Sequence, residues 1–408
     1  MSHGNEKLQN YFSYANTTGH GIIGKHNLSK HNLTFRETSV LLNSRLKLDG
    51  SMNLMRQVVK NKPTVGGFYM NPLVGLYRFP RGEDISYYKE NFEVYDEGRN
   101  LNIQNWHTSY EDFEQNPYWI TNRILSKENR MHVIVSLSAN LKINDWLSLQ
   151  ARGNVDYIND KVRQQFYAST APALAGANGR YIEMDYQETQ YYGDAILMMK
   201  KQWDAFSLNA ALGASINDKT VNSTRYDSKT ASLKYANVFN LANIIMNGSA
   251  GLDQKIDARR QLQSLFATAQ LGYNEFVYLD LSARNDWSST LAYTSHEKSG
   301  FFYPSVGFSL IFNKLMTLPR WVSLAKIRGA YSMVGNDIPM FITNPSSHIT
   351  AGGEFLASDA APFKDMEPEM THSFEAGIEA RFLKNRIGLN ATFYTVSYTH
   401  LTLPTNSL

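Results

Sequence analysis

The sequence predicts an all-β protein, and more specifically an antiparallel up-and-down transmembrane β-barrel with about thirteen strands. Three observations lead to this prediction. Long segments alternate between apolar and polar residues, the connections between these segments alternate between short and long, and tryptophans lie beside the short connections.

The alternating segments are long enough to cross a lipid bilayer. In Leu46–Leu54 one face carries Leu, Gly and Met, whereas the other carries Lys, Asp, Ser and Asn. The pattern recurs in Leu147–Val155, Phe206–Ser215, Val277–Arg284 and Ser373–Phe382. Such segments have roughly nine to twelve residues, which exceeds the length typical of soluble strands and matches what a spanning strand needs. Alternation alone also fits a soluble β-sandwich, so it leaves both architectures open.

The lengths of the connections separate these two architectures. The short connections lie near residues 42–45, 142–145, 200–204, 273–276, 313–320 and 383–386. The long connections are predicted at residues 17–31, 56–130, 157–188, 217–261, 285–300 and 334–370. Because the two kinds alternate, all short turns would lie at one end of the strands and all long loops at the other, as in outer-membrane barrels. A Greek-key sandwich has no reason to produce this asymmetry.

Three tryptophans agree with the barrel. Trp146, Trp203 and Trp321 each lie beside a short turn. An indole ring suits a lipid–water boundary, where the ring is buried and its N–H stays hydrated. We therefore predict that these residues are membrane-interface aromatics rather than core tryptophans at strand starts.

Composition and charge exclude several other classes of protein. The 40 basic residues nearly balance the 37 acidic ones, and no basic stripe is present, so no nucleic acid is expected as a partner. The absence of cysteine excludes a disulfide framework, a thiolate metal site and a cysteine nucleophile. No apolar run reaches the roughly 18 residues of a transmembrane helix. Met1–Asn10 lacks the apolar core of a signal peptide, and we expect that the chain begins inside a longer protein.

Several segments resemble, in their order along the chain, the SusC/RagA family, which comprises TonB-dependent transporters of the Bacteroidetes outer membrane. The resemblance is carried by GGFYMNPLVGLYRFPRG (Gly66–Gly82), QNWHTSYEDFEQNPYWI (Gln104–Ile120), FYASTAPALAGANGRYI (Phe166–Ile182), ARNDWSSTL (Ala283–Leu291), FFYPSVGFSL (Phe301–Leu310), KIRGAYSMVGNDIP (Lys326–Pro339) and PEMTHSFEAGIEARFL (Pro368–Leu383). It covers nearly the whole chain, from about Asn10 to about Thr395.

The resemblance implies a barrel of about 22 strands with a plugged lumen. Residues 1–395 would then be part of a TonB-dependent receptor β-barrel with long extracellular loops, without the N-terminal plug domain and the closing strands. Residues 396–408 (VSYTHLTLPTNSL) break the alternation. We interpret them as a non-matching tail of artefactual origin, with an ordinary variable loop as the alternative.

The function implied by the resemblance is energy-dependent import of an oligomeric nutrient, either a glycan or a peptide, across the outer membrane. The implied partners are a SusD-like surface lipoprotein over the loops, TonB through the missing N-terminal region, and outer-membrane lipid around the barrel. No enzymatic activity, metal or cofactor is expected.

Candidate binding residues lie in the longest predicted loop, 56–130. Trp106, Tyr110, Phe113, Tyr118 and Trp119 crowd this loop beside Asn and Gln. Exposed aromatic rings can stack on sugars or hold peptide side chains. The alternative is that these rings pack the loop into a small core of its own.

We find no catalytic or metal-binding pattern. His20, His26 and His31 fall in the predicted loop 17–31, but no spacing fixes a coordination shell, so we interpret them as solvated residues. Asp84, Asp96 and Glu97 could offer carboxylate oxygens to a calcium ion, but acidic loop residues are usually solvated, and we interpret them in that way. Two other functions stay open at this point: a soluble secreted β-protein that binds glycans, and a barrel enzyme, for which no Ser/His/acid set can be assembled.

Overall fold

The computed structural model describes residues 1–63, 69–108, 114–229, 233–246, 251–345, 347–349, 355–358 and 361–398. One 14-stranded antiparallel sheet dominates it, and its strand order follows the chain. Its strands are β1 (Ser2–Gly4), β2 (Leu8–His20), β3 (Asn27–Leu41), β4 (Leu46–Lys60), β7 (Ile124–Lys142), β8 (Leu147–Phe166), β9 (Arg180–Trp203), β10 (Phe206–Asp227), β11 (Gly251–Tyr273), β12 (Val277–Ser288), β13 (Phe301–Ile311), β14 (Val322–Asn336), β17 (Glu369–Phe382) and β18 (Ile387–Tyr398). Apart from the three-residue β1, these are the thirteen or so strands that the alternation predicts.

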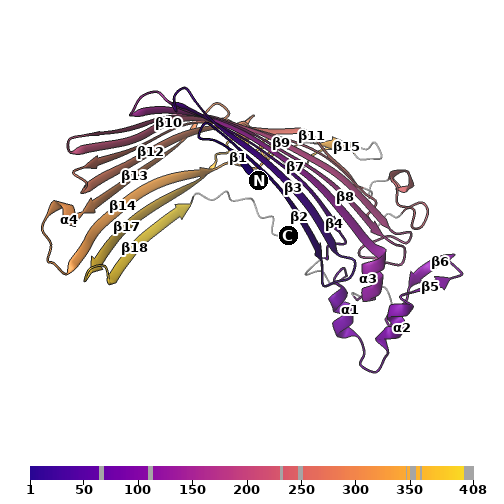
Figure 1. Ribbon diagram of the computed structural model, residues 1–408. Coiled ribbons are helices and arrows are strands. Elements are labelled where there is room, and N and C mark those ends of the chain that lie inside the picture. The colour runs from indigo at the N-terminus through magenta and orange to yellow at the C-terminus, as the bar shows by residue number, and fades with distance from the viewer. Residues whose placement is uncertain are drawn as a thin grey trace.

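The sheet is strongly curved but open. β1 and β18 form its two edges and do not pair with each other in the described part of the chain. In Figure 1 the sheet arches over, with α4 (Phe312–Leu315) at one end of the strands and α1 (Pro72–Arg78) at the other. The prediction of an incomplete up-and-down barrel is thereby confirmed.

One face of the sheet is apolar, and we call it the outer face. Strand register places six leucines side by side across six strands: Leu41, Leu46, Leu141, Leu149, Leu197 and Leu212. Large side chains on this face stay open, since Leu137 is 61% exposed and Leu265 is 50% exposed. The other sheets among the described residues have only two strands each, so no second sheet covers this face. A dry sandwich core is therefore excluded, and lipid is the environment that suits these side chains.

The opposite, inner face is polar. A parallel row of registered residues on that face reads Thr38, Asp49, Ser138, Arg152, Asp194, Ser215, Ser264 and Asp286. The predicted alternation between an apolar and a polar face is therefore confirmed at the level of strand register.

Several strands run far beyond the apolar part of the outer face. β9 has 24 residues, but its outward side chains are apolar or small only from Met199 to Tyr191. Beyond Tyr191 the outward positions are Thr189, Gln187 and then acidic residues, while pairing with β8 and β10 continues. Alternation therefore ends where the apolar part of the outer face ends, whereas the backbone ladder continues because neighbouring strands satisfy its N–H and C=O groups.

This extension shortens every predicted long loop. The observed connections are residues 61–123, 167–179, 228–250, 289–300 and 337–368. The predicted loop 17–31 is wrong, because β2 and β3 pair through His20 and Asn27 and leave only residues 21–26 between them. His31 therefore lies on β3, and its Nδ1 is 2.7 Å from the Tyr14 hydroxyl.

Strand pairing reaches the first three residues of the predicted tail, 396–408, and the non-matching, artefactual origin of that tail stays a prediction. β18 continues to Tyr398, and Val396, Ser397 and Tyr398 pair with β17. A strand at the edge of a sheet needs only its neighbour's backbone, so loss of the side-chain pattern does not end it. Residues 399–408 lie outside the described residues.

The buried apolar cores lie in the loops rather than in the sheet wall. Three clusters centre on Leu233, Phe166 and Leu291, each near the end of the strands that carries the long loops. We call this the long-loop end and the opposite one the short-turn end. Among the helices that the structure describes, none has the length and apolar character to cross a membrane.

Candidate functional site

The loop at residues 61–123 is folded into small, capped elements. It contains α1, α2 (Ile85–Glu90), β5 (Glu93–Asp96), β6 (Leu101–Gln104) and α3 (Pro117–Arg123). The side chains of Asn71, Asp84 and Asn116 each accept a hydrogen bond from a backbone N–H in the first turn of a helix. Such caps satisfy donors that a short helix leaves open. Asp84 is thus occupied by a structural role rather than offered to a cation.

Rings in this loop gather around Trp106. Its ring centroid lies 5.2 Å from those of Phe79 and Tyr88 and 4.8 Å from that of His107. Burial, assisted by a hydrogen bond to Glu83, raises the pKa of Tyr88 above its ordinary value. The four rings form a half-buried aromatic cluster, which can offer ring faces and edges to a ligand.

Buried amides join this loop to the next one. Asn116 is fully buried, and its Nδ2 donates to the carbonyl oxygens of Tyr88 and Asn105 at 2.9 and 2.8 Å. Gln104 donates through Nε2 to the Ser169 carbonyl at 3.2 Å, which ties the loop at residues 61–123 to the loop at residues 167–179. Buried amides with these partners satisfy the polar groups of the loops and hold them in one arrangement.

The predicted binding aromatics fall into three groups. Trp119 is 1% exposed, and its indole N–H donates to Thr170 Oγ1 at 3.1 Å, so it packs the loops together and offers no open ring face. Trp106 and Tyr118 are only partly buried and stay candidates for ligand contact. Tyr110 and Phe113 lie outside the described residues.

Asp227 holds the loop at residues 228–250 directly and the loop at residues 167–179 through Arg180, whose Nη1 donates to the Leu174 carbonyl at 2.9 Å. Its carboxylate accepts two hydrogen bonds from Arg180, both at 2.8 Å, one from Arg225 at 2.7 Å and one from the backbone N–H of Lys229 at 2.8 Å. Burial alone would raise its pKa, but the bonds and charges of Arg180, Lys229 and Arg225 together outweigh burial and hold the pKa of Asp227 below its ordinary value.

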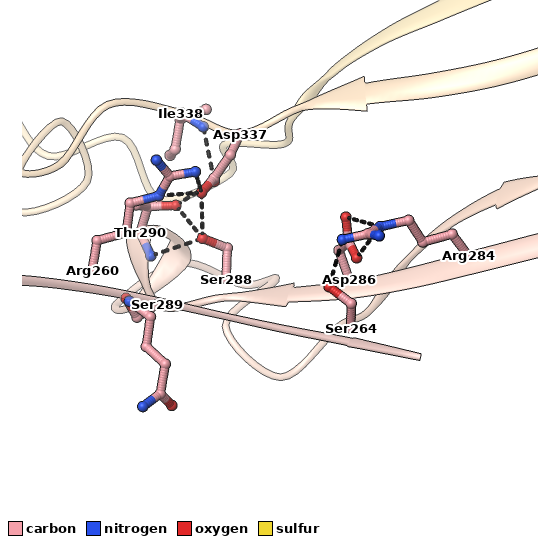
Figure 2. A network of polar contacts seen from close by, with 10 residues as sticks. Arg260, Ser264, Arg284, Asp286, Ser288, Ser289, Thr290, Asp337 and Ile338 are labelled. Atoms are coloured by element: carbon pink, nitrogen blue, oxygen red, sulfur yellow. Dashed lines mark hydrogen bonds and ion pairs between the residues drawn. The ribbon is translucent and has the colours of Figure 1, made fainter. Parts of the chain in front are cut away.

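A second hub, centred on Asp337, holds the loops at residues 289–300 and 337–368. Figure 2 shows Arg260, Ser288 and Thr290 converging on this carboxylate. Arg260 pairs with it at 2.7 Å, and the two hydroxyls donate at 2.7 and 2.6 Å. The N–H of Ile338 adds a fourth partner at 2.9 Å. Four donors on a side chain that is 13% exposed make this a structural clamp rather than a proton-transfer group.

The residues of this clamp belong to segments that the sequence analysis singled out, but their contact was not predicted. Ser288 and Thr290 belong to ARNDWSSTL, and Asp337 belongs to KIRGAYSMVGNDIP. Both segments contribute to the family resemblance, yet nothing local indicates that a carboxylate in one segment binds hydroxyls in the other.

The inner face carries ion pairs along its length. Arg152 binds both oxygens of Asp194 at distances of 3.0 Å or less, and the Tyr192 hydroxyl donates to the same carboxylate at 2.7 Å. Arg36 and Asp49 form a similar bidentate pair nearer the first strands. A wall lined by such charges can guide a polar solute without presenting an apolar trap.

The predicted interface tryptophans all lie at the short-turn end. Trp146, Trp203 and Trp321 are 41%, 43% and 56% exposed, respectively. The rings of Trp203 and Phe206 stack at 6.3 Å, and those of Trp321 and Phe382 at 5.6 Å. Their placement at a membrane boundary stays a prediction.

Comparisons with known proteins agree with this geometry. Solved structures with the same fold include the RagAB peptide transporter, with a TM-score of 0.70, 17% identity and coverage of 97% of this chain and 43% of that chain. P. aeruginosa FpvA bound to pyoverdines gives a TM-score of 0.54 with 13% identity, covering 96% and 44% of the two chains. The siderophore receptor PiuA from Acinetobacter baumannii gives 0.53 with 11% identity, covering 95% and 53%.

The chain thus spans less than half of the RagAB transporter chain that it matches. No curated protein matches it. The family model described as TonB dependent receptor-like, beta-barrel matches residues 68–407. Proteins of that family are transporters of the bacterial outer membrane and not enzymes, and barrels of that membrane carry their long loops on the extracellular side. The chain belongs to the TonB-dependent receptor β-barrel family.

Proposed function

We propose that this barrel is part of a TonB-dependent transporter that imports an oligomeric nutrient, a glycan or a peptide, across the outer membrane. One observation carries the proposal: a single curved sheet with an open apolar outer face, a charged inner face and folded loops at one end only. Lipid outside and a hydrated passage inside are what such a wall separates. The similarity in fold to the RagAB peptide transporter supports the same proposal.

The proposed partners follow from the two ends of the wall. The loops at the long-loop end form a cap whose rings and amides would meet the substrate and a SusD-like surface lipoprotein. TonB would act from the periplasmic side through a region that precedes the barrel in the SusC/RagA family. Transport by this stretch of chain alone is not expected, because the barrel supplies passage and loop contacts while the force acts on the plug.

The alternative of a soluble secreted glycan-binding protein conflicts with the outer face. In a soluble protein, the leucines in register across six neighbouring strands would all contact water. An exposed apolar surface of this extent marks contact with a membrane or another protein. The protein should therefore need detergent to stay monodisperse, whereas a soluble lectin would not.

Transport itself is tested by uptake in cells that carry the full-length transporter. We expect fluorescent oligopeptides or oligosaccharides to accumulate in the periplasm, and a protonophore to abolish that accumulation because TonB is energised by the inner membrane. Deletion of the gene should remove uptake of one of the two substrate classes. Loss of neither class, or uptake that survives the protonophore, would overturn the proposal.

A further inference from the structure

Positive side chains gather on the outer face just beyond its apolar band, towards the long-loop end. Lys60 on β4, Lys127 on β7 and Arg163 on β8 are direct neighbours in register, and Lys161 lies one outward position nearer the band on β8. All four are exposed. We call these four residues the basic patch.

The patch has more positive charge than the protein neutralises. Like charges directly opposite each other on paired strands destabilise a sheet. Arg163 pairs with Glu183 at 3.1 Å and Lys161 with Asp185 at 3.2 Å, so two carboxylates face four cations. Lys60 and Lys127 form no ion pair with any of the described residues. An anion from outside the protein would relieve the remaining repulsion.

The height of the patch matches that of lipid headgroups. On β7 the last large apolar outward residue is Met131, which is 50% exposed, and Lys127 lies two outward positions beyond it. Four residues span about 13 Å along a strand, or about 10 Å along the membrane normal at the tilt of barrel strands. Headgroups occupy roughly the first 5–8 Å beyond the hydrocarbon, and a lysine stem can reach back towards them. The ammonium groups of the patch are therefore level with headgroup phosphates.

A shallow depression lies within the patch. It has a volume of about 270 Å³, and Lys127, Lys161 and Arg163 line it together with Asn129, Glu183 and Asp185. The cations and the amide can donate to an anion seated there. The apolar band below it continues through Met131 and Tyr157 on the same outer face.

We propose that the basic patch binds the phosphate of a lipid headgroup in the outer leaflet. A phosphorylated lipid places its acyl chains against the apolar band and its phosphate against the patch, so one molecule satisfies both surfaces, which neither a free anion nor an acidic protein does. The inference rests on the membrane placement of the barrel and is independent of the transported substrate.

The test compares lipid binding by the full-length protein, purified in detergent, and by its K60Q/K127Q/R163Q variant. The probes are a phosphorylated lipid A and its dephosphorylated form, counted per protein by native mass spectrometry. We expect the amount of phosphorylated lipid bound to the variant to be at least about tenfold lower than that bound to the unaltered protein. Each cation near an anionic surface contributes to binding, and the variant lacks three of them. The dephosphorylated form should bind both proteins equally weakly, and inorganic phosphate at millimolar concentration should not displace the lipid.

The matched control replaces three basic residues at the short-turn end, in the variant R45Q/K201Q/K384Q. Its lipid binding should stay within about twofold of that of the unaltered protein, because the control loses the same number of charges but keeps the basic patch intact. Equal binding by the patch variant, an equal loss in the control, or displacement by free phosphate would each overturn the proposal.

A second measurement covers the case in which the triple variant does not fold. Lys127→Gln removes the central charge of the registered row. In neutral detergent the substitution should raise the unfolding midpoint, because repulsion falls. In vesicles that contain the phosphorylated lipid it should lower the midpoint, because the lipid contact is lost. A shift of the same sign in both media contradicts the proposal.

Discussion

The barrel wall and the loops at the long-loop end are stabilised in opposite ways. The wall is a single layer of strands, and the apolar side chains on its outer face are exposed, as is Leu212 at 50%. In the loops apolar residues such as Leu233 and Leu291 are fully buried, and charged side chains converge on single carboxylates. The wall takes its stability from the backbone ladder and the surrounding lipid, whereas the loops carry their own dry cores. Substitutions should therefore act differently in the two regions.

The largest effect is expected in the loop core. Trp119→Ala would leave a cavity between two loops and remove the partner of Thr170, at a cost of about 3–5 kcal/mol of local stability. Hydrogen exchange should accelerate in residues 114–123 and 167–179, while the strands of the wall stay protected. The control Trp203→Ala, at an exposed turn, should leave loop exchange unchanged. If Trp203→Ala opened the loops as much as Trp119→Ala, the separation of the two regions would be wrong.

The wall should respond to charge on one face only. Leu197 lies on the outer face of β9 between Leu149 and Leu212, halfway along the strand between Trp203 and Tyr191. Leu197→Arg should cost about 2–4 kcal/mol of stability in vesicles, since the charge would face hydrocarbon. The next residue, Met198, lines a cavity of about 850 Å³ with Ser148 and Asn209, so Met198→Arg should have a small effect. Urea unfolding in vesicles and the heat-modifiable folded fraction measure both, and equal losses would contradict the assignment of the two faces.

A smaller effect is expected at the second hub. Asp337→Asn keeps the shape of the side chain but removes the charge that pairs with Arg260, which corresponds to about 1.5–3 kcal/mol for hydrogen bonds to a charged group. Proteolysis of residues 289–300 should increase. The control is Asp365→Asn, since Asp365 contacts Ser295 and His296 but its side chain is 88% exposed. Loop cleavage that is the same in both variants would show that the hub does not clamp the loops.

The same contrast explains what could be predicted from the sequence. The alternation in Leu46–Leu54 and the turns beside Trp146 and Trp203 are determined by residues that are close together in the sequence. The strands of the wall and the polarity of its two faces were therefore predictable. The position of Trp119 in a core depends on Thr170, fifty-one positions away, and Asp337 depends on a segment 47 to 77 positions away. No local pattern encodes such contacts. Loop boundaries were misplaced for a related reason, because alternation reports where the apolar part of the outer face ends and not where pairing ends.

The smallest effect is expected when acid protonates Asp227. It should lower the stability of the loops alone and leave that of the wall unchanged. The pKa of this carboxyl lies below its ordinary value of 3.8. The stability it contributes is therefore fully present at neutral pH, begins to fall near pH 4, and is lost as pH decreases through the lower pKa of the folded state. Hydrogen exchange in residues 167–179 and 233–246 should rise over that range while the wall stays protected. In Asp227→Asn the rise should vanish and exchange should already be faster at neutral pH, whereas Asp204→Asn, in a short turn, should behave like the unaltered protein. Arg180 and Arg225 stay charged over this whole pH range, so they cannot cause the response. If the exchange of the loops still rises with acid in Asp227→Asn, a titratable group other than Asp227 is responsible for it.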